Sequence, residues 1–192
     1  MARPKEFERE EVLERAIKVF ADHGFEGTST DALMHSMGIS RQSLYDTFGD
    51  KRSLYLEALR YYSAKSVSDL IHNLHGGSSP LKGLEAALLT YAAKPTEEAP
   101  LGCLGIGAIC EFGRSDKDVS LLTDMSGQTV VAAFRRLVAD AKQAGETSQD
   151  IDVQTAAEFL LTTISGMQVA ARGGATPESL QNIARMAIRS LK

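Results

Sequence analysis

The feature that most constrains the fold is the helical spacing of apolar residues, which recurs along the 192-residue chain. One stripe consists of Leu13, Ala16, Ile17, Phe20 and Ala21, at intervals of three and four residues that place them on one face of an α-helix. A comparable stripe extends from Val153 to Ala171. No run of alternating apolar and β-branched residues between turn signals indicates a strand. The sequence therefore predicts an all-α fold.

Glycine, proline and capping residues divide the chain into about nine expected helices. Glycines follow the first short stripes, Gly76 to Pro80 is the clearest mid-chain break, and Thr176 before Pro177 is a typical helix start. The expected helices cover about residues 8–23, 29–37, 40–48, 51–74, 81–93, 101–112, 118–144, 153–171 and 177–191. We expect residues 1–50 to form an N-terminal domain and residues 51–192 a second helical domain.

The charge balance limits how the chain could bind nucleic acid. The 21 Lys and Arg residues face 25 Asp and Glu residues, a formal net charge of -4. Residues 1–55 contain eight basic and ten acidic side chains, so this part is not basic either. Binding by bulk charge is excluded, and any DNA affinity has to come from a few placed donors with a steep salt dependence. The Arg3-Pro4-Lys5 arm is either a minor-groove contact or a disordered terminus.

The expected compartment is the cytoplasm. The first residues contain no apolar run of the kind found in a signal peptide, and no segment approaches the roughly 18 apolar residues of a spanning helix. Two cysteines cannot form a disulfide framework, which favours a reducing environment. We expect no membrane association.

The most informative segment is the pair of short helices joined by Gly38-Ile39-Ser40. This pattern is typical of a helix-turn-helix, whose second helix enters the DNA major groove. Glycine permits the tight turn, and serine caps the following helix. Arg41, Gln42 and Ser43 then occupy the first turn, where Arg can pair with guanine and Gln with adenine. Hydroxyl and ammonium donors around them suit phosphate oxygens; these are Thr28, Thr30, Tyr45, Thr47 and Lys51.

The same region resembles the N-terminal signature of the tetracycline-repressor (TetR) family. The resemblance rests on Gly24 to Ser29 (GFEGTS), Gly38 to Tyr45 (GISRQSLY) and Phe48 to Leu54 (FGDKRSL). It implies a homodimeric bacterial transcriptional regulator whose N-terminal domain binds a palindromic operator and whose C-terminal domain binds a small-molecule inducer. Our interpretation is a repressor, although the sequence does not give the sign of regulation. It also implies a dimer interface on the last two long helices. The helix over residues 51–74 would join both domains and transmit the signal.

The chain departs from the family pattern before Phe48. Members often carry an aromatic residue and a histidine where this chain has Asp46 and Thr47. Because phosphate would repel the carboxylate of Asp46, we do not expect it to contact DNA.

The C-terminal half offers candidates for an inducer pocket. Aromatic, polar and sulfur-containing residues on several helices could line one, although such residues in a helical bundle are more often core. The candidates are Tyr91, Cys103, Phe112, Phe134, Phe159, Thr163 and Met167.

Cys103 and Cys110 lie seven positions apart in an apolar, glycine-rich stretch. That stretch lacks the strand and spacing of a nucleotide-binding loop. We expect two buried structural cysteines. The alternative is a regulator that senses oxidants or electrophiles through these thiols.

No grouping of residues indicates an enzyme, a metal site or a cofactor, so we expect none of the three. The four histidines have no spacing partner for a metal. The remaining alternative is an all-α ligand-binding protein without DNA binding.

Overall fold

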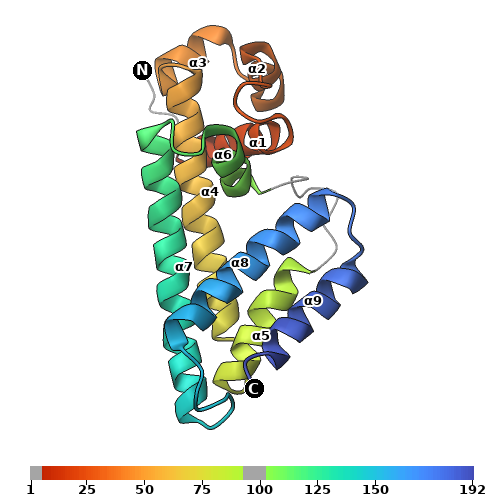
Figure 1. Cartoon of the computed structure of the whole chain (residues 1–192). Coiled ribbons are helices and arrows are strands. Elements are labelled where there is room, and N and C mark those ends of the chain that lie inside the picture. Colours follow the sequence, from red (N-terminus) through yellow and green to blue (C-terminus); the bar gives the residue numbers. More distant parts are fainter. Residues whose placement is uncertain (1–5, 93–102) are drawn as a thin grey trace. The chain divides into compact units, whose positions relative to one another are not determined.

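The computed structural model describes residues 6–92 and 103–192, with side chains from Arg9 onward. The described residues form nine helices and no strand, which confirms the predicted all-α class (Figure 1). The helices are α1 (Glu6–His23), α2 (Thr30–Met37), α3 (Arg41–Phe48), α4 (Lys51–Leu74), α5 (Pro80–Tyr91), α6 (Leu104–Phe112), α7 (Lys117–Gln143), α8 (Val153–Arg172) and α9 (Pro177–Arg189). The arm Arg3-Pro4-Lys5 and most of the expected loop after α5 lie outside the described residues.

The helix ends follow the local capping signals. The side chains of Ser29, Ser40 and Asp50 accept hydrogen bonds from backbone N–H groups three residues on, at the starts of α2, α3 and α4. Thr176 caps α9 in the same way, with Pro177 as the first helical residue. Gly38 ends α2 in the left-handed conformation (φ 70°). These contacts are local in sequence, which is why the helix boundaries could be predicted.

The chain packs as two compact units, to both of which α4 and α7 contribute residues. In the first unit, residues 6–63 pack with residues 103–123. Its core brings together one face of α1 with the inner sides of α2, α3 and the start of α4, and Leu104 and Ala108 of α6 join it. Phe20, Phe25, Tyr55 and Phe112 form an aromatic cluster within this unit, with ring centroids 5.0 to 6.5 Å apart.

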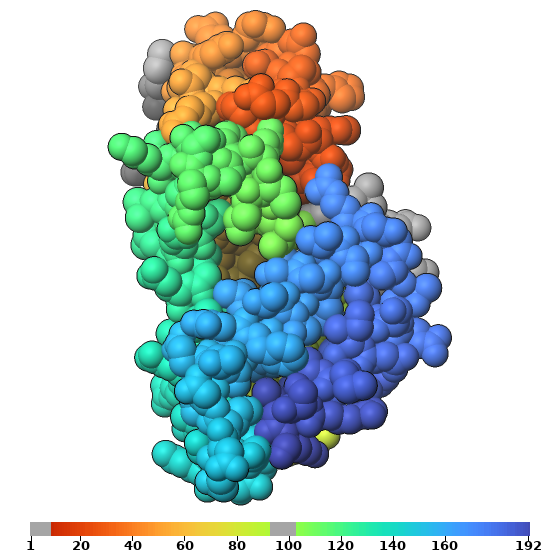
Figure 2. Space-filling model, viewed as in Figure 1, coloured from red at the N-terminus to blue at the C-terminus, as the bar shows by residue number. Residues whose placement is uncertain are grey.

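The second unit consists of residues 64–92 and 124–192. Helices α5, α8 and α9 contact one another pairwise, and α8 and α9 lie side by side on the face shown in Figure 2. Leu84, Leu88, Phe134 and Leu160 are fully buried in its core. Within the described parts of the chain, no helix has the length and apolar character needed to cross a membrane.

Candidate nucleic-acid interface

The two short helices α2 and α3 form the predicted helix-turn-helix. Leu33 and Met37 of α2 and Leu44 of α3 are buried, and Ile39 in the turn packs against the same core. One side of each helix is therefore fixed to the first unit by apolar contacts. Because a buried side holds each helix, the opposite side of α3 is left facing solvent.

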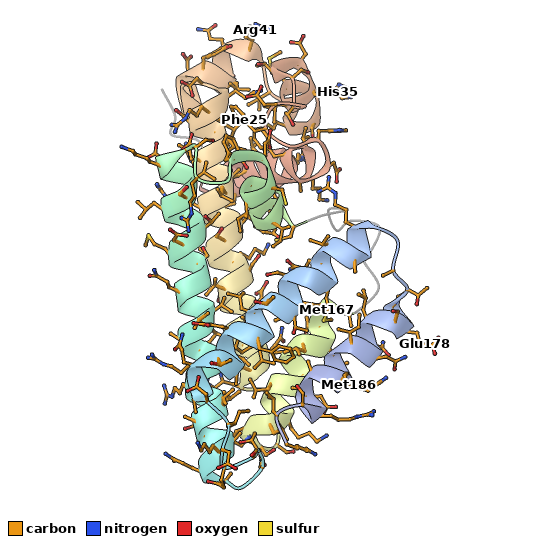
Figure 3. All side chains as sticks on the ribbon, viewed as in Figure 1. Phe25, His35, Arg41, Met167, Glu178 and Met186 are labelled. Carbon is orange, nitrogen blue, oxygen red and sulfur yellow. The ribbon has the colours of Figure 1, made fainter. Side chains whose placement is uncertain are left out.

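The first turn of α3 presents the residues predicted to read bases. Arg41, Gln42 and Ser43 are all exposed, and Figure 3 shows Arg41 projecting from the outer side of the helix. Ser40 has a different role, since its Oγ accepts from the backbone N–H of Ser43 at 3.1 Å. Arg41 Nη2 lies 2.9 Å from a carboxylate oxygen of Asp31 on α2. Asp31 is in the first turn of α2, so the guanidinium of Arg41 is held by an acid from the other helix of the pair.

The predicted phosphate donors fall into two groups. Tyr45 is 45% exposed on α3, and Thr47 and Thr30 are partly exposed, so their hydroxyl groups remain candidates. Thr28 does not fit this role, because its side chain is 2% exposed and its Oγ1 donates to the carbonyl of Gly24 at 2.5 Å. A side chain buried against its own turn cannot reach a phosphate, and we drop Thr28 as a contact.

Lys51 also has a different role from the predicted one. Its Nζ donates to the carbonyl oxygens of Phe25 and Thr28, at 2.8 and 3.0 Å, and lies 4.2 Å from the centroid of the Phe25 ring. Both carbonyls belong to the segment between α1 and α2, residues 24–29, which we call the α1–α2 turn. Lys51 therefore holds this turn, and its ammonium already donates two hydrogen bonds within the protein.

Most other cations of the first unit are also paired. Of the six Lys and Arg residues between positions 9 and 55, five donate a hydrogen bond. Arg52 forms ion pairs with Asp116 at 2.9 Å and Asp118 at 2.8 Å. The backbone N–H of Val119 and the Arg52 guanidinium lower the pKa of Asp116, so this pair persists into acidic solution. The first unit, which the sequence already showed not to be basic, therefore has few unpaired cations to offer a phosphate.

The pocket candidates are divided between the two units. Phe134 and Met167 are sealed in the core of the second unit, and Tyr91 packs against that core. Phe112 belongs to the aromatic cluster of the first unit. Phe159 is 42% exposed on α8, and Thr163 donates its hydroxyl hydrogen bond to the Phe159 carbonyl. Two surface clefts, each of about 510 Å³, are lined by none of the seven candidates.

The expectation of two buried cysteines is wrong. Cys103 caps the start of α6 and is half-buried, whereas Cys110 is exposed. The reason is the orientation of α6, whose Leu104 and Ala108 face the core, so position 110 falls on the outer side. No group of three or more potential metal ligands occurs among the described side chains.

Two family models match this chain, and one of them covers the helix-turn-helix. A model described as "Bacterial regulatory proteins, tetR family" matches residues 12–58. A second, described as "Tetracyclin repressor-like, C-terminal domain", matches residues 77–187. The chain belongs to the tetR family of bacterial regulatory proteins. The predicted resemblance is confirmed, and the family is one of regulators and not of enzymes.

Full-length relatives of this tetR-family chain include two bacterial regulators. The HTH-type transcriptional regulator YezE of Bacillus subtilis (strain 168) is 31% identical over 95% of both chains. The HTH-type transcriptional repressor ComR of Escherichia coli (strain K12) is 30% identical over 97% of this chain and 90% of its own length. A cysteine mutant of the TetR family transcriptional regulator CifR, complexed with 26bp double-strand operator DNA, is 29% identical. The TM-score is 0.85, over 99% of this chain and all of CifR.

Sequence reasoning missed two residues that contact the helix-turn-helix or the turn leading into it. Asp31 contacts Arg41 across ten positions, a pairing that an explicit helix-turn-helix geometry would have indicated. Glu111 of α6 accepts hydrogen bonds from the α1–α2 turn across more than eighty positions. No local pattern in the sequence signals the second contact.

Proposed function

We propose that this tetR-family chain is a transcriptional repressor that binds a palindromic operator as a homodimer and leaves it when a small molecule binds. The observation that carries the proposal is the exposed first turn of α3. Arg41 and Gln42, whose side chains suit guanine and adenine, stand there on a helix anchored by its opposite side. Tyr45, Thr47 and Thr30 remain our candidates for phosphate contacts, and Ser40 acts through its cap.

The comparisons support this proposal. CifR, similar over its whole length, has been solved with operator DNA, and ComR is named a repressor. We also propose that the chain works in the bacterial cytoplasm, associated with the nucleoid, because its operator would lie there.

The exposed surface of the last two helices supports the homodimer. Phe159 and Val169 on α8 and Ile183 and Met186 on α9 are between 42% and 63% exposed, although large apolar side chains usually avoid water. Met186 is labelled on α9 in Figure 3. A second copy covering these side chains would form a two-fold interface. The dimer would present its two α3 helices to half-sites about 34 Å apart, or a multiple of that distance.

We propose an inducer because the chain belongs to the tetR family, and we assign no residue to the inducer-binding site. Because the seven predicted pocket residues are divided between two cores and the surface, we name none of them as ligand contacts. A thermal-shift screen for compounds that also release operator DNA would identify the ligand class. A second candidate mode of regulation, sensing of oxidants or electrophiles, is favoured by the exposed thiol of Cys110.

A selection experiment tests the DNA-binding function. Full-length protein would select duplexes from a random-sequence library, and mobility shifts would then compare wild type with Arg41→Ala and Gln42→Ala. We expect each variant to relax the preference at particular base pairs by about 1–3 kcal/mol. Arg135→Ala and Gln128→Ala change the same residue types at exposed positions of α7 and should leave the preference unchanged. Failure to select any preferred sequence, with and without added ligands, would instead indicate a ligand-binding protein without DNA binding.

A further inference from the structure

The α1–α2 turn is held from α6 by a single carboxylate. Glu111 Oε2 accepts from the backbone N–H of Phe25 at 2.8 Å, and its Oε1 accepts from that of Glu26 at 2.7 Å. Hydrogen bonds between N–H groups and an ionised acceptor are short and strong compared with neutral ones. The two donors lie 86 and 85 positions before Glu111. Glu111 thus ties α6 directly to the backbone that leads into α2.

The fit at this contact is tight. Gly24 has a φ of +73°, and a Cβ at this position would lie 2.9 Å from Glu111 Oε2. Phe25, labelled in Figure 3, also packs its ring 5.6 Å from that of Phe112, the neighbour of Glu111 on α6. The turn therefore meets α6 through one polar and one aromatic contact.

The carbonyl side of the same turn is held by Lys51. Its Nζ bonds to the Phe25 and Thr28 carbonyl oxygens, while Glu111 holds the neighbouring N–H groups. A carboxylate on α6 and an ammonium on α4 together fix a turn whose last residue, Ser29, caps α2. Because α2 and α3 share a core, we expect a displacement of this turn to be passed on to both helices.

We propose that Glu111 is a positioning residue of the DNA interface, which sets the orientation of α3 relative to α6. This inference rests on the proposed repressor function and deepens it. Any ligand or thiol adduct that shifts α6 would weaken the Glu111 contacts and change the presentation of Arg41. The contact links α6 directly to the turn that leads into the helix-turn-helix, beside the contacts of Lys51 from α4.

The test uses full-length variants and a duplex selected by the wild-type protein. Glu111→Gln retains the size of the side chain, but its amide can accept from only one of the two N–H groups and turns an NH₂ toward the other. Glu111→Asp retains the charge and shortens the reach. We expect both variants to lower the ratio of selected-duplex to unrelated-duplex affinity by about tenfold, the order of one charge-assisted hydrogen bond. Affinity for unrelated DNA should stay the same or rise slightly.

Glu146→Gln is the matched control. Glu146 also accepts from a backbone N–H at a helix start, that of Leu81 at 2.8 Å, but in the second unit. It should lower the melting temperature without changing the affinity ratio. Hydrogen exchange supplies the second readout, since the amides of Phe25 and Glu26 should exchange faster only in the Glu111 variants.

The outcomes separate the two proposals. Faster exchange at the turn with an unchanged affinity ratio would reduce Glu111 to a structural contact and overturn the inference alone. Unchanged exchange would show that Glu111 does not hold the turn, which also overturns it. A wild-type chain with no preference for any duplex would overturn the repressor function and the inference with it.

Discussion

At the scale of single residues, the ion pair of Arg41 and Asp31 lies on the surface proposed to read DNA. The two side chains are 61% and 78% exposed, and such exposed pairs add little to folding stability. We therefore expect the pair to affect DNA binding more than folding stability. The carboxylate of Asp31 accepts a hydrogen bond from one guanidinium nitrogen of Arg41, which limits the access of Arg41 to phosphates of any sequence. The other N–H groups of the guanidinium remain for a base edge.

We predict that Asp31→Asn strengthens binding to all DNA but lowers the preference for the selected duplex several-fold. Removal of a negative charge near the phosphates raises affinity generally, and a released Arg41 gains phosphate contacts that carry no sequence information. Asp46→Asn removes the same charge from an exposed position on α3 and should strengthen binding without altering the preference. Fluorescence anisotropy at fixed salt measures both quantities. Equal preferences in the two variants would contradict a role for Asp31 in specificity.

At the scale of one element, α6 combines a buried side with an outward-facing one. Leu104 and Ala108 join the core of the first unit, while Ile109 and Cys110 are exposed next to Glu111. Cys103 and Cys110 lie seven residues apart along this helix, a separation of about 10 Å. A disulfide requires Cα atoms within about 7 Å, so the intact helix does not allow one between them.

We predict that mild oxidation produces no Cys103–Cys110 disulfide while α6 is intact, and that iodoacetamide modifies Cys110 faster than Cys103. If thiol chemistry regulates the protein, Cys110→Ser should abolish operator release by an oxidant or electrophile, whereas Cys103→Ser should retain it. Mass spectrometry of the alkylated protein and mobility shifts measure the two effects. An intramolecular disulfide formed with unchanged helix content would contradict the geometry of α6.

At the scale of the whole molecule, function depends on a second copy of the chain. A palindromic site is read by two α3 helices, and one copy supplies only one of them. The exposed apolar side chains of α8 and α9 are the proposed contact, but apolar side chains are also exposed on α7. An experiment that compares the two surfaces directly is therefore needed.

We predict that Met186→Glu converts the protein to a monomer in analytical ultracentrifugation at micromolar concentration and lowers operator affinity at least tenfold. A carboxylate at this position of α9 would lose its water on association without gaining a partner. Met125→Glu is the matched control, because Met125 on α7 is 57% exposed against 63% for Met186. A Met125→Glu monomer, or a Met186→Glu dimer, would place the interface elsewhere.

The sequence by itself determined the all-α class, the helix boundaries and the helix-turn-helix. These depend on interactions between residues three or four positions apart, such as the Ser40 cap of α3, and the boundaries found lie close to those predicted. Arg41 and Gln42 could be placed on the exposed first turn of α3 for the same reason. The charge count correctly indicated a reading domain with few cations to spare.

Only the tertiary structure decided which polar groups remain for DNA. Thr28 and Lys51 donate hydrogen bonds to carbonyl groups of the α1–α2 turn, and Glu111 of α6 accepts hydrogen bonds from N–H groups of that turn. Phe159 lies on the surface, although its apolar side chain would suit a core. A polar side chain bonds to whichever backbone group folding brings within about 3 Å, and for Lys51 and Glu111 that group lies more than twenty and more than eighty positions away. Periodicity and capping carry no information about contacts at such separations.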